Sequence, residues 1–162
     1  MHRGDVPLVV EPGVGLAAQR EAAGVWARAT AVRDGLPSVP SLADKLVGVQ
    51  QALGEAGASL LVARRGATIV GFCVLVPQGD VLEVRYLAAD PSAWGSGVAP
   101  ALLDGVGSRA RAGSFERGEL WVIADNARAI ALYERSFWVG TERIEVRGSA
   151  GRPERLFTRR FA

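Results

Sequence analysis

Residues 81–99 read VLEVRYLAADPSAWGSGVA, an extended apolar run followed by a turn that carries two glycines. The run over 81–89 is typical of a strand. Beyond the glycines, apolar residues recur every four positions as far as Gly113, which predicts a helix. A glycine-rich turn between a strand and a helix presents unpaired N–H groups at the positive end of the helix dipole, so it suits a diphosphate. Taken alone, such a turn can also be purely structural.

The rest of the chain divides into helical segments before this stretch and alternating strands and helices after it. Small and apolar residues at helical spacing predict the first helix, and Ser41, a residue type favoured at the N-cap, begins the second. The expected elements, in chain order, are helices over about 16–32 and 41–57, an antiparallel meander of strands over 59–64, 68–76 and 81–89, a helix over 98–113, a strand over 119–123, a helix from 125, and a closing hairpin of 138–146 with 154–161. The layout is mixed α/β, and only the strand that ends before Trp94 and the strand over 119–123 must run parallel.

Length and composition fit one globular domain over residues 1–162. Hydrophobic residues make up 49% of the chain and charged residues 22%, so a packed core is expected. The longest apolar run, 67–77, is shorter than the roughly 18 residues that a membrane span needs, and the N-terminus lacks a basic segment followed by an apolar one. We therefore expect a cytoplasmic protein that does not bind a membrane.

The scarcity of some side chains excludes several kinds of site. His2 is the only histidine and lies near a chain end, so a Ser-His-Asp triad or a Cys/His metal site has almost no residues to be built from. Lys45 is the only lysine and has no Gly-Lys-Ser/Thr beside it, so a P-loop is absent. Cys73, the only cysteine, lies within an apolar run and is expected to be a small buried side chain. With 19 basic against 17 acidic residues and no long basic stretch, nucleic-acid binding is not expected.

Three segments of this sequence are similar to the motifs of one superfamily. Residues 83–91 read EVRYLAADP, residues 94–99 read WGSGVA and residues 126–134 read NARAIALYE. In the GNAT superfamily of acyl-CoA-dependent N-acyltransferases, a strand ends in Leu-x-Val-x-Pro, a turn reads Arg/Gln-x-x-Gly-x-Gly/Ala, and a later helix begins at Asn and contains Leu-Tyr-Glu. The order and spacing agree, so the chain resembles this superfamily over nearly its whole length. The resemblance implies a mixed, mostly antiparallel sheet with flanking helices and a splayed central pair of parallel strands.

The resemblance implies acetyl-CoA, or a close acyl-CoA, as the acyl donor, and it implies no metal. Backbone N–H groups from Gly95 to Ala99 would hold the diphosphate. The main chain near Leu87 and Ala89 would pair with the pantetheine arm as an added strand would, and the acetyl group would lie beside Leu87. The residues implied to bind the donor are Leu87, Ala89, Trp94, Gly95, Ser96, Gly97, Val98, Ala99 and Asn126.

Two side chains are candidates for proton transfer. Tyr133 lies seven residues after Asn126, so both share one helix face, and the resemblance makes Tyr133 the acid that protonates the departing thiolate. The structural alternatives are a helix cap at Asn126 and a packing role for Tyr133. Glu83 is the best available base for the incoming ammonium group, because strand alternation places it on the same face as Leu87. An ion pair with Arg85 is the alternative for Glu83, and a water chain can replace a carboxylate base.

Three positions depart from the superfamily pattern. Trp94 stands where Arg or Gln is usual, which removes a side-chain donor near the phosphates and leaves the backbone N–H groups in place. Pro100 has no N–H, so the first helical turn loses one donor. Residues 136–138 read SFW where Gly-Phe or Gly-Trp is usual, so the helix must end without its glycine, and we expect the geometry near Tyr133 to shift.

The predicted function is N-acetyltransfer. An amine, once deprotonated, attacks the thioester of acetyl-CoA directly in a ternary complex, and backbone N–H groups near Leu87 stabilise the oxyanion. The main alternative is a non-catalytic domain that binds acyl-CoA as a sensor or within an assembly, and another is a structural module that does not bind the coenzyme. The acceptor is expected to be selected by the first two helices, their connecting loop around 35–40 and the terminal hairpin, which carry no recognisable motif. The acceptor amine therefore stays open, from small molecules to protein amines, and so does assembly as a homodimer.

Overall fold

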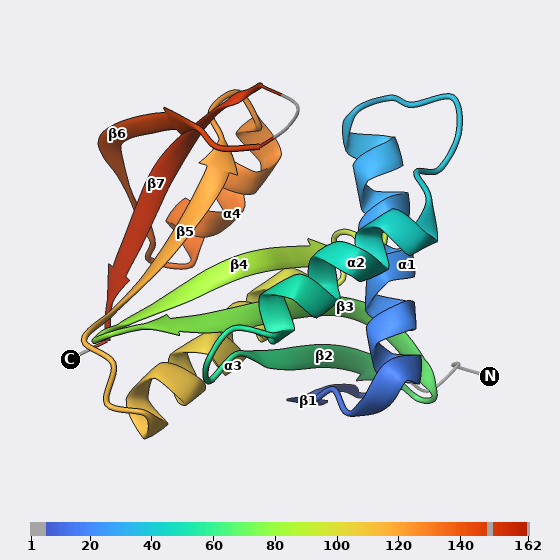
Figure 1. Ribbon diagram of the computed structural model, residues 1–162, viewed down its shortest axis with the longest axis horizontal. Helices are drawn as coiled ribbons and strands as arrows, with labels where there is room; N and C mark the ends of the chain where they lie inside the picture. Colours follow the sequence, from blue (N-terminus) through green and yellow to red (C-terminus); the bar gives the residue numbers. More distant parts are fainter. Residues whose placement is uncertain (1–5, 149–150, 162) are drawn as a thin grey trace.

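The computed structural model describes residues 6–148 and 151–161, which form a sheet of seven strands flanked by helices (Figure 1). The strand order is β1-β2-β3-β4-β5-β7-β6. The elements are β1 (Leu8–Pro12), α1 (Gly15–Arg33), α2 (Leu42–Leu53), β2 (Ser59–Arg65), β3 (Thr68–Gln78), β4 (Val81–Ala89), the 3₁₀ helix η1 (Pro91–Ala93), α3 (Val98–Ala112), β5 (Arg117–Ile123), α4 (Ala127–Arg135), β6 (Val139–Val146) and β7 (Pro153–Arg160). Neighbouring strands run antiparallel except β4 and β5, which are parallel. The predicted fold class is confirmed.

Helix and hairpin signals in the sequence act as predicted. The hydroxyl oxygen of Ser41 accepts a hydrogen bond from the N–H of Asp44 at 3.4 Å, which caps the start of α2. Gly66 (φ +61°) and Gly79 (φ +63°) are left-handed and close the two hairpins that join β2, β3 and β4. The meander therefore forms where the turn residues place it.

The first strand, β1, is an element that the sequence pattern does not predict. It lies at the edge of the sheet and pairs with β2, so the meander becomes four antiparallel strands. Leu8 and Val10 pack towards the core, while Val9 is exposed. This alternation covers three apolar residues and ends at Pro12, which is too short to separate a strand from a loop. The proline is tolerated because the strand is at an edge.

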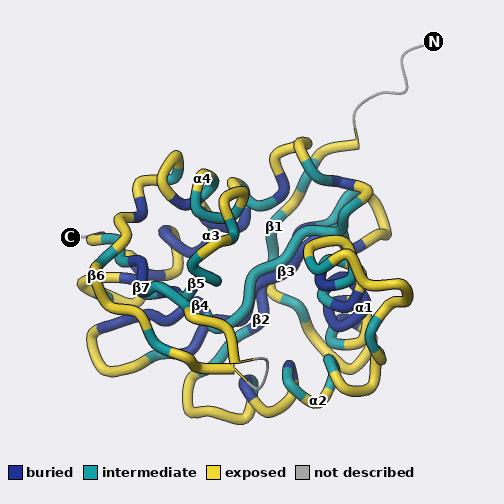
Figure 2. Tube along the Cα trace, turned by 90° about the horizontal axis from the view of Figure 1, so that it is seen from above, coloured by how far each residue is buried: buried dark blue, intermediate teal, exposed yellow. Residues whose placement is uncertain are grey.

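The sheet separates two hydrophobic cores (Figure 2). On one face, α3 and α4 cover the sheet, with Leu102 and Tyr133 among their buried residues. On the other face, α1 and α2 pack on the strands of the meander through Val25 and Val49. A side chain on β4 therefore meets a different set of helices depending on the face to which it points.

Gly71 in β3 lets the first turn of α3 approach the sheet closely. A β carbon at this position would lie 2.5 Å from Cγ1 of Val98 and 3.1 Å from Cδ1 of Leu102. Contacts this short are not tolerated, so any larger residue would push the helix away. The absence of a side chain at Gly71 thus positions the start of α3 beside the end of β4.

The expectations about Cys73, about metal ligands and about membrane-spanning helices concern residues that the structure describes in part. Cys73 is completely buried in β3, as expected, and burial raises the pKa of its thiol to about 12. His2 lies outside the described residues. Among the residues that are described, no three His, Cys, Asp or Glu side chains are grouped so that they could hold a metal ion. Of the described helices, none combines the length and the apolar character needed to cross a bilayer.

Candidate active site

The parallel strands β4 and β5 separate along their length (Figure 1). They pair from Val81 opposite Arg117 to Val84 opposite Leu120, and within the described residues no later pair joins them. Beyond this point β4 continues beside β3, and β5 continues beside β7. The backbone groups that line the widening gap have no strand partner across it, so an extended ligand can pair with them. The predicted splay of the central strands is confirmed.

The turn after β4 is held in a conformation that glycine adopts readily. Gly95 (φ +79°) and Gly97 (φ +89°) are both left-handed, and a β carbon at either would meet no atom within 4 Å. Gly97 is the N-cap residue of α3, and no side chain caps this helix within the described part of the chain. The first N–H groups of α3 therefore have no intrahelical partner, and the space beside the two glycines is open. This turn has the geometry that an anion site at a helix N-terminus requires.

Trp94 ties this turn to the end of β4. Its Nε1–H donates a hydrogen bond to the carbonyl oxygen of Ala89 at 2.9 Å. The Arg128 guanidinium, from the first turn of α4, lies 3.6 Å from the centre of the Trp94 ring in a cation–π contact. The tryptophan that replaces the usual Arg or Gln therefore brings an arginine from another element to the same place. Pairing of Ala89 with the pantetheine arm stays a prediction, and its carbonyl already accepts one hydrogen bond.

The proposed acyl side of β4 faces α3 and α4. Leu87 and Ala89 pack against the core that contains Val98 and Tyr133. Leu87 lies opposite Cys73 of β3, so the thiol is part of the same packed region. The structure thus brings the strand end, the start of α3 and the tyrosine of α4 together on one face of the sheet.

Glu83 lies on the other face, which corrects the arrangement expected from strand alternation. Between two paired positions β4 has one more residue than β3, so Arg85 forms a β-bulge. An extra residue reverses the alternation beyond it. Val84 and Leu87 therefore both face α3, whereas Tyr86 packs on the α1 side. Glu83 is adjacent to Val84 and points to the α1 side, so the expectation that it shares a face with Leu87 is wrong.

Glu83 belongs to an ion-pair network that joins β4 to the segment after α2. Its Oε2 accepts a hydrogen bond from Nε of Arg85 at 2.8 Å. The other nitrogens of the guanidinium contact both carboxylate oxygens of Glu55, and Glu55, followed by Glu83, raises the pKa of Arg85. The ion pair given above as an alternative for Glu83 is therefore present. Oε1 of Glu83 has no hydrogen-bond partner among the described residues, so a base role stays a prediction.

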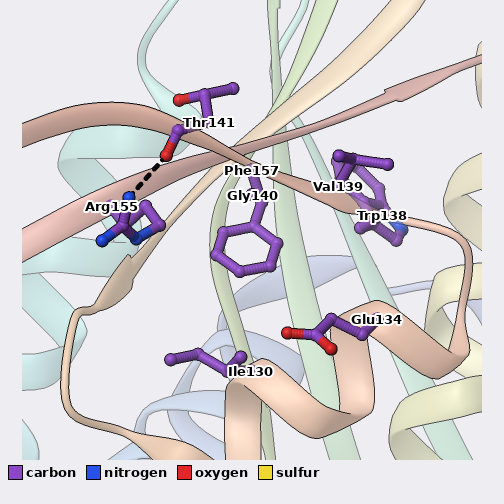
Figure 3. Close-up of a pocket in the computed structure, with 8 residues that line it drawn as sticks. All are labelled: Ile130, Glu134, Trp138, Val139, Gly140, Thr141, Arg155 and Phe157. Carbon is purple, nitrogen blue, oxygen red and sulfur yellow. Dashed lines mark hydrogen bonds between the residues drawn. The ribbon is translucent and has the colours of Figure 1, made fainter.

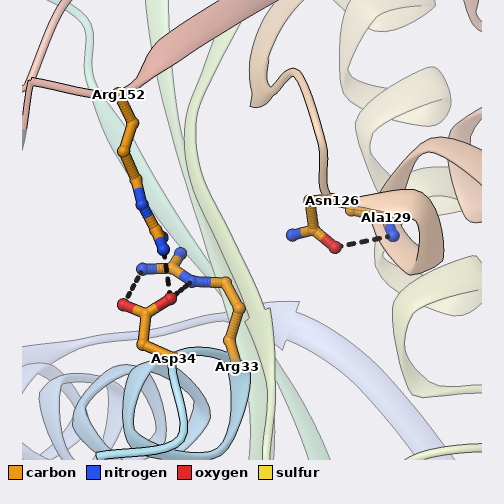
Figure 4. A network of polar contacts seen from close by, with 5 residues as sticks. All are labelled: Arg33, Asp34, Asn126, Ala129 and Arg152. Carbon is orange, nitrogen blue, oxygen red and sulfur yellow. Dashed lines mark hydrogen bonds and ion pairs between the residues drawn. The ribbon is translucent and has the colours of Figure 1, made fainter.

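Asn126 caps α4 (Figure 4). Its Oδ1 accepts a hydrogen bond from the N–H of Ala129 at 3.2 Å, and its amide nitrogen points away from that helix end. The structural alternative for this residue is therefore correct. A contact with the pantetheine arm stays a prediction, and the amide nitrogen, which donates to no protein group in the part of the chain described, is the atom available for it.

Tyr133 is buried in the core of the α4 face. Its ring lies beside that of Phe157, with 6.1 Å between the centroids, and 8% of the residue is exposed. Burial, with Cys73 as a smaller second cause, raises the pKa of Tyr133 to about 12. Its hydroxyl forms no hydrogen bond to the described residues. A phenol of this pKa stays protonated over the physiological range, which is the state that a general acid needs.

The helix that carries Tyr133 ends without a glycine. The N–H of Trp138 donates to the carbonyl of Tyr133 at 2.9 Å, and the N–H of Phe137 donates to the carbonyl of Glu134 at 3.2 Å. These two bonds define a Schellman motif. Phe137 supplies the left-handed residue (φ +70°), at a cost of about 1 kcal/mol relative to glycine. The hydrogen bonds of the helix end are thus formed without a glycine, and the shift expected near Tyr133 stays a prediction.

An ion-pair cluster joins the segment after α1 to the segment before β7 (Figure 4). Arg33 donates to both carboxylate oxygens of Asp34 at 3.0 Å, and Arg152 donates to Oδ1 at 2.8 Å. The hydrogen bond from Arg33, with that from Arg152, lowers the pKa of Asp34 to about 2 against the opposing effect of burial. Two of the segments expected to select the acceptor are therefore in contact with each other.

Two arginines beside the glycine turn are absent from the site predicted from sequence. Arg65, at the end of β2, donates to the hydroxyl and to the carbonyl oxygen of Ser96, both at 2.8 Å. Arg128 stacks on Trp94, as described above. Motif spacing does not reveal either contact, because each arginine comes from an element distant in sequence. The available signals are an arginine pair at a hairpin turn and an arginine just after the helix cap at Asn126.

A cavity of about 520 Å³ lies between α4 and the strands β6 and β7 (Figure 3). Its apolar wall includes Ile130 and Phe157, and the Glu134 carboxylate points towards Phe157. Arg155, at its edge, donates to the carbonyl oxygen of Thr141 at 2.7 Å. None of the site residues predicted from sequence lines this cavity, so it is separate from the gap between β4 and β5.

The model of the acetyltransferase (GNAT) family matches residues 29–137, which is more than half of the chain. The chain belongs to this family. The motifs on which the resemblance depends, from the glycine turn to the helix that carries Tyr133, lie within the matched residues.

Individual relatives agree with this assignment. Over 71 residues the chain is 41% identical to a mycothiol acetyltransferase from Beutenbergia cavernae, a match that covers 44% of this chain and 24% of that protein. The chain thus spans about a quarter of the length of the curated relatives it matches. The solved ribosomal-protein-S18-alanine N-acetyltransferase from Escherichia coli has a TM-score of 0.75 at 16% identity, covering 96% of this chain and 95% of that one. The PaiA N-acetyltransferase from Thermoplasma acidophilum, solved with coenzyme A, has a TM-score of 0.73 at 12% identity, covering 95% and 99%. At these identities the solved structures show a shared fold.

Proposed function

We propose that the protein transfers an acetyl group from acetyl-CoA to a primary amine, directly and within a ternary complex. The main support is the gap between β4 and β5, which leads to the glycine turn at the start of α3. A long donor with a diphosphate near one end fits a row of unpaired backbone groups that ends at oriented N–H groups. Membership of the acetyltransferase (GNAT) family supports the same donor.

The residues present fit the diphosphate part of this donor. Gly95 and Gly97 leave open space beside the backbone, because a β carbon at either would meet no neighbouring atom. The first turn of α3 carries no acidic residue that would oppose an anion, although Pro100 supplies no N–H. Backbone N–H groups from Gly95 to Ala99 would hold the diphosphate, except that of Ser96, which already donates to the carbonyl of Ala93 at 3.3 Å. Acetyl-CoA, when bound, supplies an acyl group that is activated as a thioester.

Two side chains would handle the protons. Tyr133, protonated at neutral pH, would donate a proton to the departing thiolate from the α4 side of the sheet. Glu83 would accept a proton from the incoming ammonium group on the α1 side, directly or through a water molecule. Backbone N–H groups near Leu87 would stabilise the oxyanion. Because Glu83 and Tyr133 lie on opposite faces of the sheet, the gap between β4 and β5 is where amine and thioester would meet.

The acceptor would bind on the α1 side, near the network of Glu83 and Arg85 and the cluster of Asp34 and Arg152. One relative is named for mycothiol and another for an alanine of a ribosomal protein. The panel of acceptors should therefore include small thiol-bearing amines and peptides that begin with alanine, together with polyamines, aminoglycosides and lysine peptides.

The test combines binding with turnover. Purified protein is titrated with acetyl-CoA in a calorimeter, and release of CoA, the free thiol product, is then followed by chromatography with each amine of the panel, so that the thiol of a thiol-bearing amine is not counted as product. We expect saturable binding and thiol release that depends on one class of amine. Binding without amine-dependent release from any member would favour the non-catalytic acyl-CoA-binding alternative. No binding at all would refute the donor assignment.

A further inference from the structure

The side chain of Arg65 crosses from the meander to the glycine turn. It is the last residue of β2, and the hairpin turn that follows contains the left-handed Gly66 (φ +61°). From there its guanidinium reaches Ser96, 31 residues later, with Nη1 on the hydroxyl oxygen and Nη2 on the carbonyl oxygen, each at 2.8 Å. Both hydrogen bonds come from a charged donor, and such bonds are stronger than those between neutral groups.

Ser96 is the residue of the turn that Arg65 holds in place. It lies between Gly95 and Gly97, which are both left-handed and have the widest conformational freedom of any residue type. Its hydroxyl also donates to the carbonyl of Ala93, so the turn is hydrogen-bonded both to the end of β2 and to η1. A clamp on Ser96 reduces the number of conformations that the two glycines sample before an anion binds, and such preorganisation raises affinity.

Arg65 also brings positive charge to a turn whose own residues, 94–97, carry no charged side chain. Trp94 occupies the position where a cationic or amide side chain is usual in this family, and its indole N–H is directed to the carbonyl of Ala89. The adjacent Arg64 points elsewhere, with Nε at 2.7 Å from a carboxylate oxygen of Glu11. The pair Arg64-Arg65 is thus divided, with one arginine anchoring the edge strand and one contacting the turn.

We propose that Arg65 is a positioning residue for the diphosphate of the acyl donor, and that by holding Ser96 it compensates for the side-chain donor which Trp94 does not provide. This inference rests on the proposed function, since it assumes that acetyl-CoA binds at the turn. Arg65 acts through Ser96 and has no part in the chemical step. Its loss should weaken recognition of the diphosphate while leaving recognition of the pantetheine arm intact.

The experiment compares two acyl donors, acetyl-CoA and S-acetylpantetheine, which lacks the diphosphate. For Arg65→Ala we expect the KM for acetyl-CoA to rise about 10- to 100-fold, equal to about 1.4–2.8 kcal/mol, with kcat within about twofold. The KM for S-acetylpantetheine should not change. Arg64→Ala removes the same charge from the neighbouring position and should leave both KM values unchanged. Arg65→Lys keeps the charge but offers a single nitrogen for two oxygens of Ser96, so an intermediate KM is expected.

The outcomes separate this inference from the proposed function. An equal rise in KM for both donors would mean that Arg65 has a general structural role, and an unchanged KM for acetyl-CoA would mean that the clamp is irrelevant. Either result overturns the inference while the proposed function stands. If the alanine variant does not fold, the lysine variant decides alone, and a KM equal to that of the parent overturns the inference. A parent protein that does not turn over acetyl-CoA overturns the proposed function and this inference with it.

Discussion

Replacing Tyr133 with phenylalanine removes one hydroxyl and keeps the buried ring. Because that hydroxyl makes no hydrogen bond to the described residues, the free energy of unfolding at neutral pH should change by less than about 0.5 kcal/mol. A general acid accelerates a reaction by about 100- to 10,000-fold. At 1.36 kcal/mol per factor of ten, the variant should lose about 2.7–5.4 kcal/mol of transition-state stabilisation.

The assay for Tyr133→Phe is thiol release at saturating acceptor, with acetyl-CoA affinity measured by calorimetry and stability by thermal unfolding. We expect kcat to fall by at least about 100-fold, with the dissociation constant of acetyl-CoA and the melting temperature nearly unchanged. Equal kcat for variant and parent would refute the acid role and leave Tyr133 as a packing residue. A large loss of stability would instead show that the hydroxyl has a structural partner.

The same variant has a signature in alkaline stability. The pKa of Tyr133 is raised from 10 to about 12 in the folded state, so the folded protein holds its proton more tightly than the unfolded chain. The corresponding stabilisation is complete below pH 10 and is lost as the pH rises to about 12, which amounts to about 2.7 kcal/mol. Cys73 gives a loss of the same sign from pH 9 upward in both proteins, so the two are compared at each pH. Unfolding curves of parent and variant that shift in parallel up to pH 12 would contradict the raised pKa.

Three further substitutions test other parts of the site. Gly97→Glu should abolish acetyl-CoA binding, because its carboxylate would project into the open space beside the turn that is assigned to the diphosphate. Unchanged affinity of a folded variant, measured by calorimetry, would remove the diphosphate assignment. Glu83→Gln should lower the rate most at low pH, where the acceptor is protonated and needs a base. It should cost at most about 1 kcal/mol of stability, because its contact with Arg85 is weakened. A pH–rate profile of the same shape as the parent's would leave Glu83 as an ion-pair partner alone. Asp34→Asn should cost about 1 kcal/mol of stability at neutral pH, because the lowered pKa of Asp34 gives a stabilisation that is present above about pH 4 and is lost as the pH falls to about 2. Thermal unfolding over this range checks it, and a stability difference that is constant with pH would count against the pairing of Asp34 with its arginines.

The sequence predicts those parts of the fold that depend on local pattern. The run over 81–89, the glycines at 95 and 97 and the helical spacing beyond them predict a strand, a turn and a helix in their correct order. The N-cap type residues Ser41 and Asn126 stand where two helices begin, and both side chains accept the capping hydrogen bond. These signals involve residues close together in the chain, so no knowledge of tertiary contacts is needed to read them.

The features that the sequence does not reveal depend on partners elsewhere in the chain. The β-bulge at Arg85 depends on how β4 pairs with β3 and is not visible in the sequence of β4. Simple alternation of side chains along β4 therefore predicts the wrong face for Glu83. The contacts of Arg65 and Arg128 with the glycine turn require three separate elements to meet. Phe137 is 77% exposed, and its left-handed conformation is held by the two backbone hydrogen bonds of the helix end, which no propensity scale contains.

The β-bulge in β4 has a consequence for how such a protein can change over time. Side chains alternate between the two faces on both sides of the bulge, and the extra residue shifts the alternation, so Glu83 faces α1 and α2 while Leu87 faces α3. One strand therefore contributes to two compartments. Under the proposed chemistry, the acceptor occupies one compartment and the coenzyme the other. Substitutions in the α1–α2 connection or near Arg152 can then alter the choice of amine without disturbing the coenzyme compartment. Relatives built on this plan are free to diverge in their acceptors while they keep a common donor.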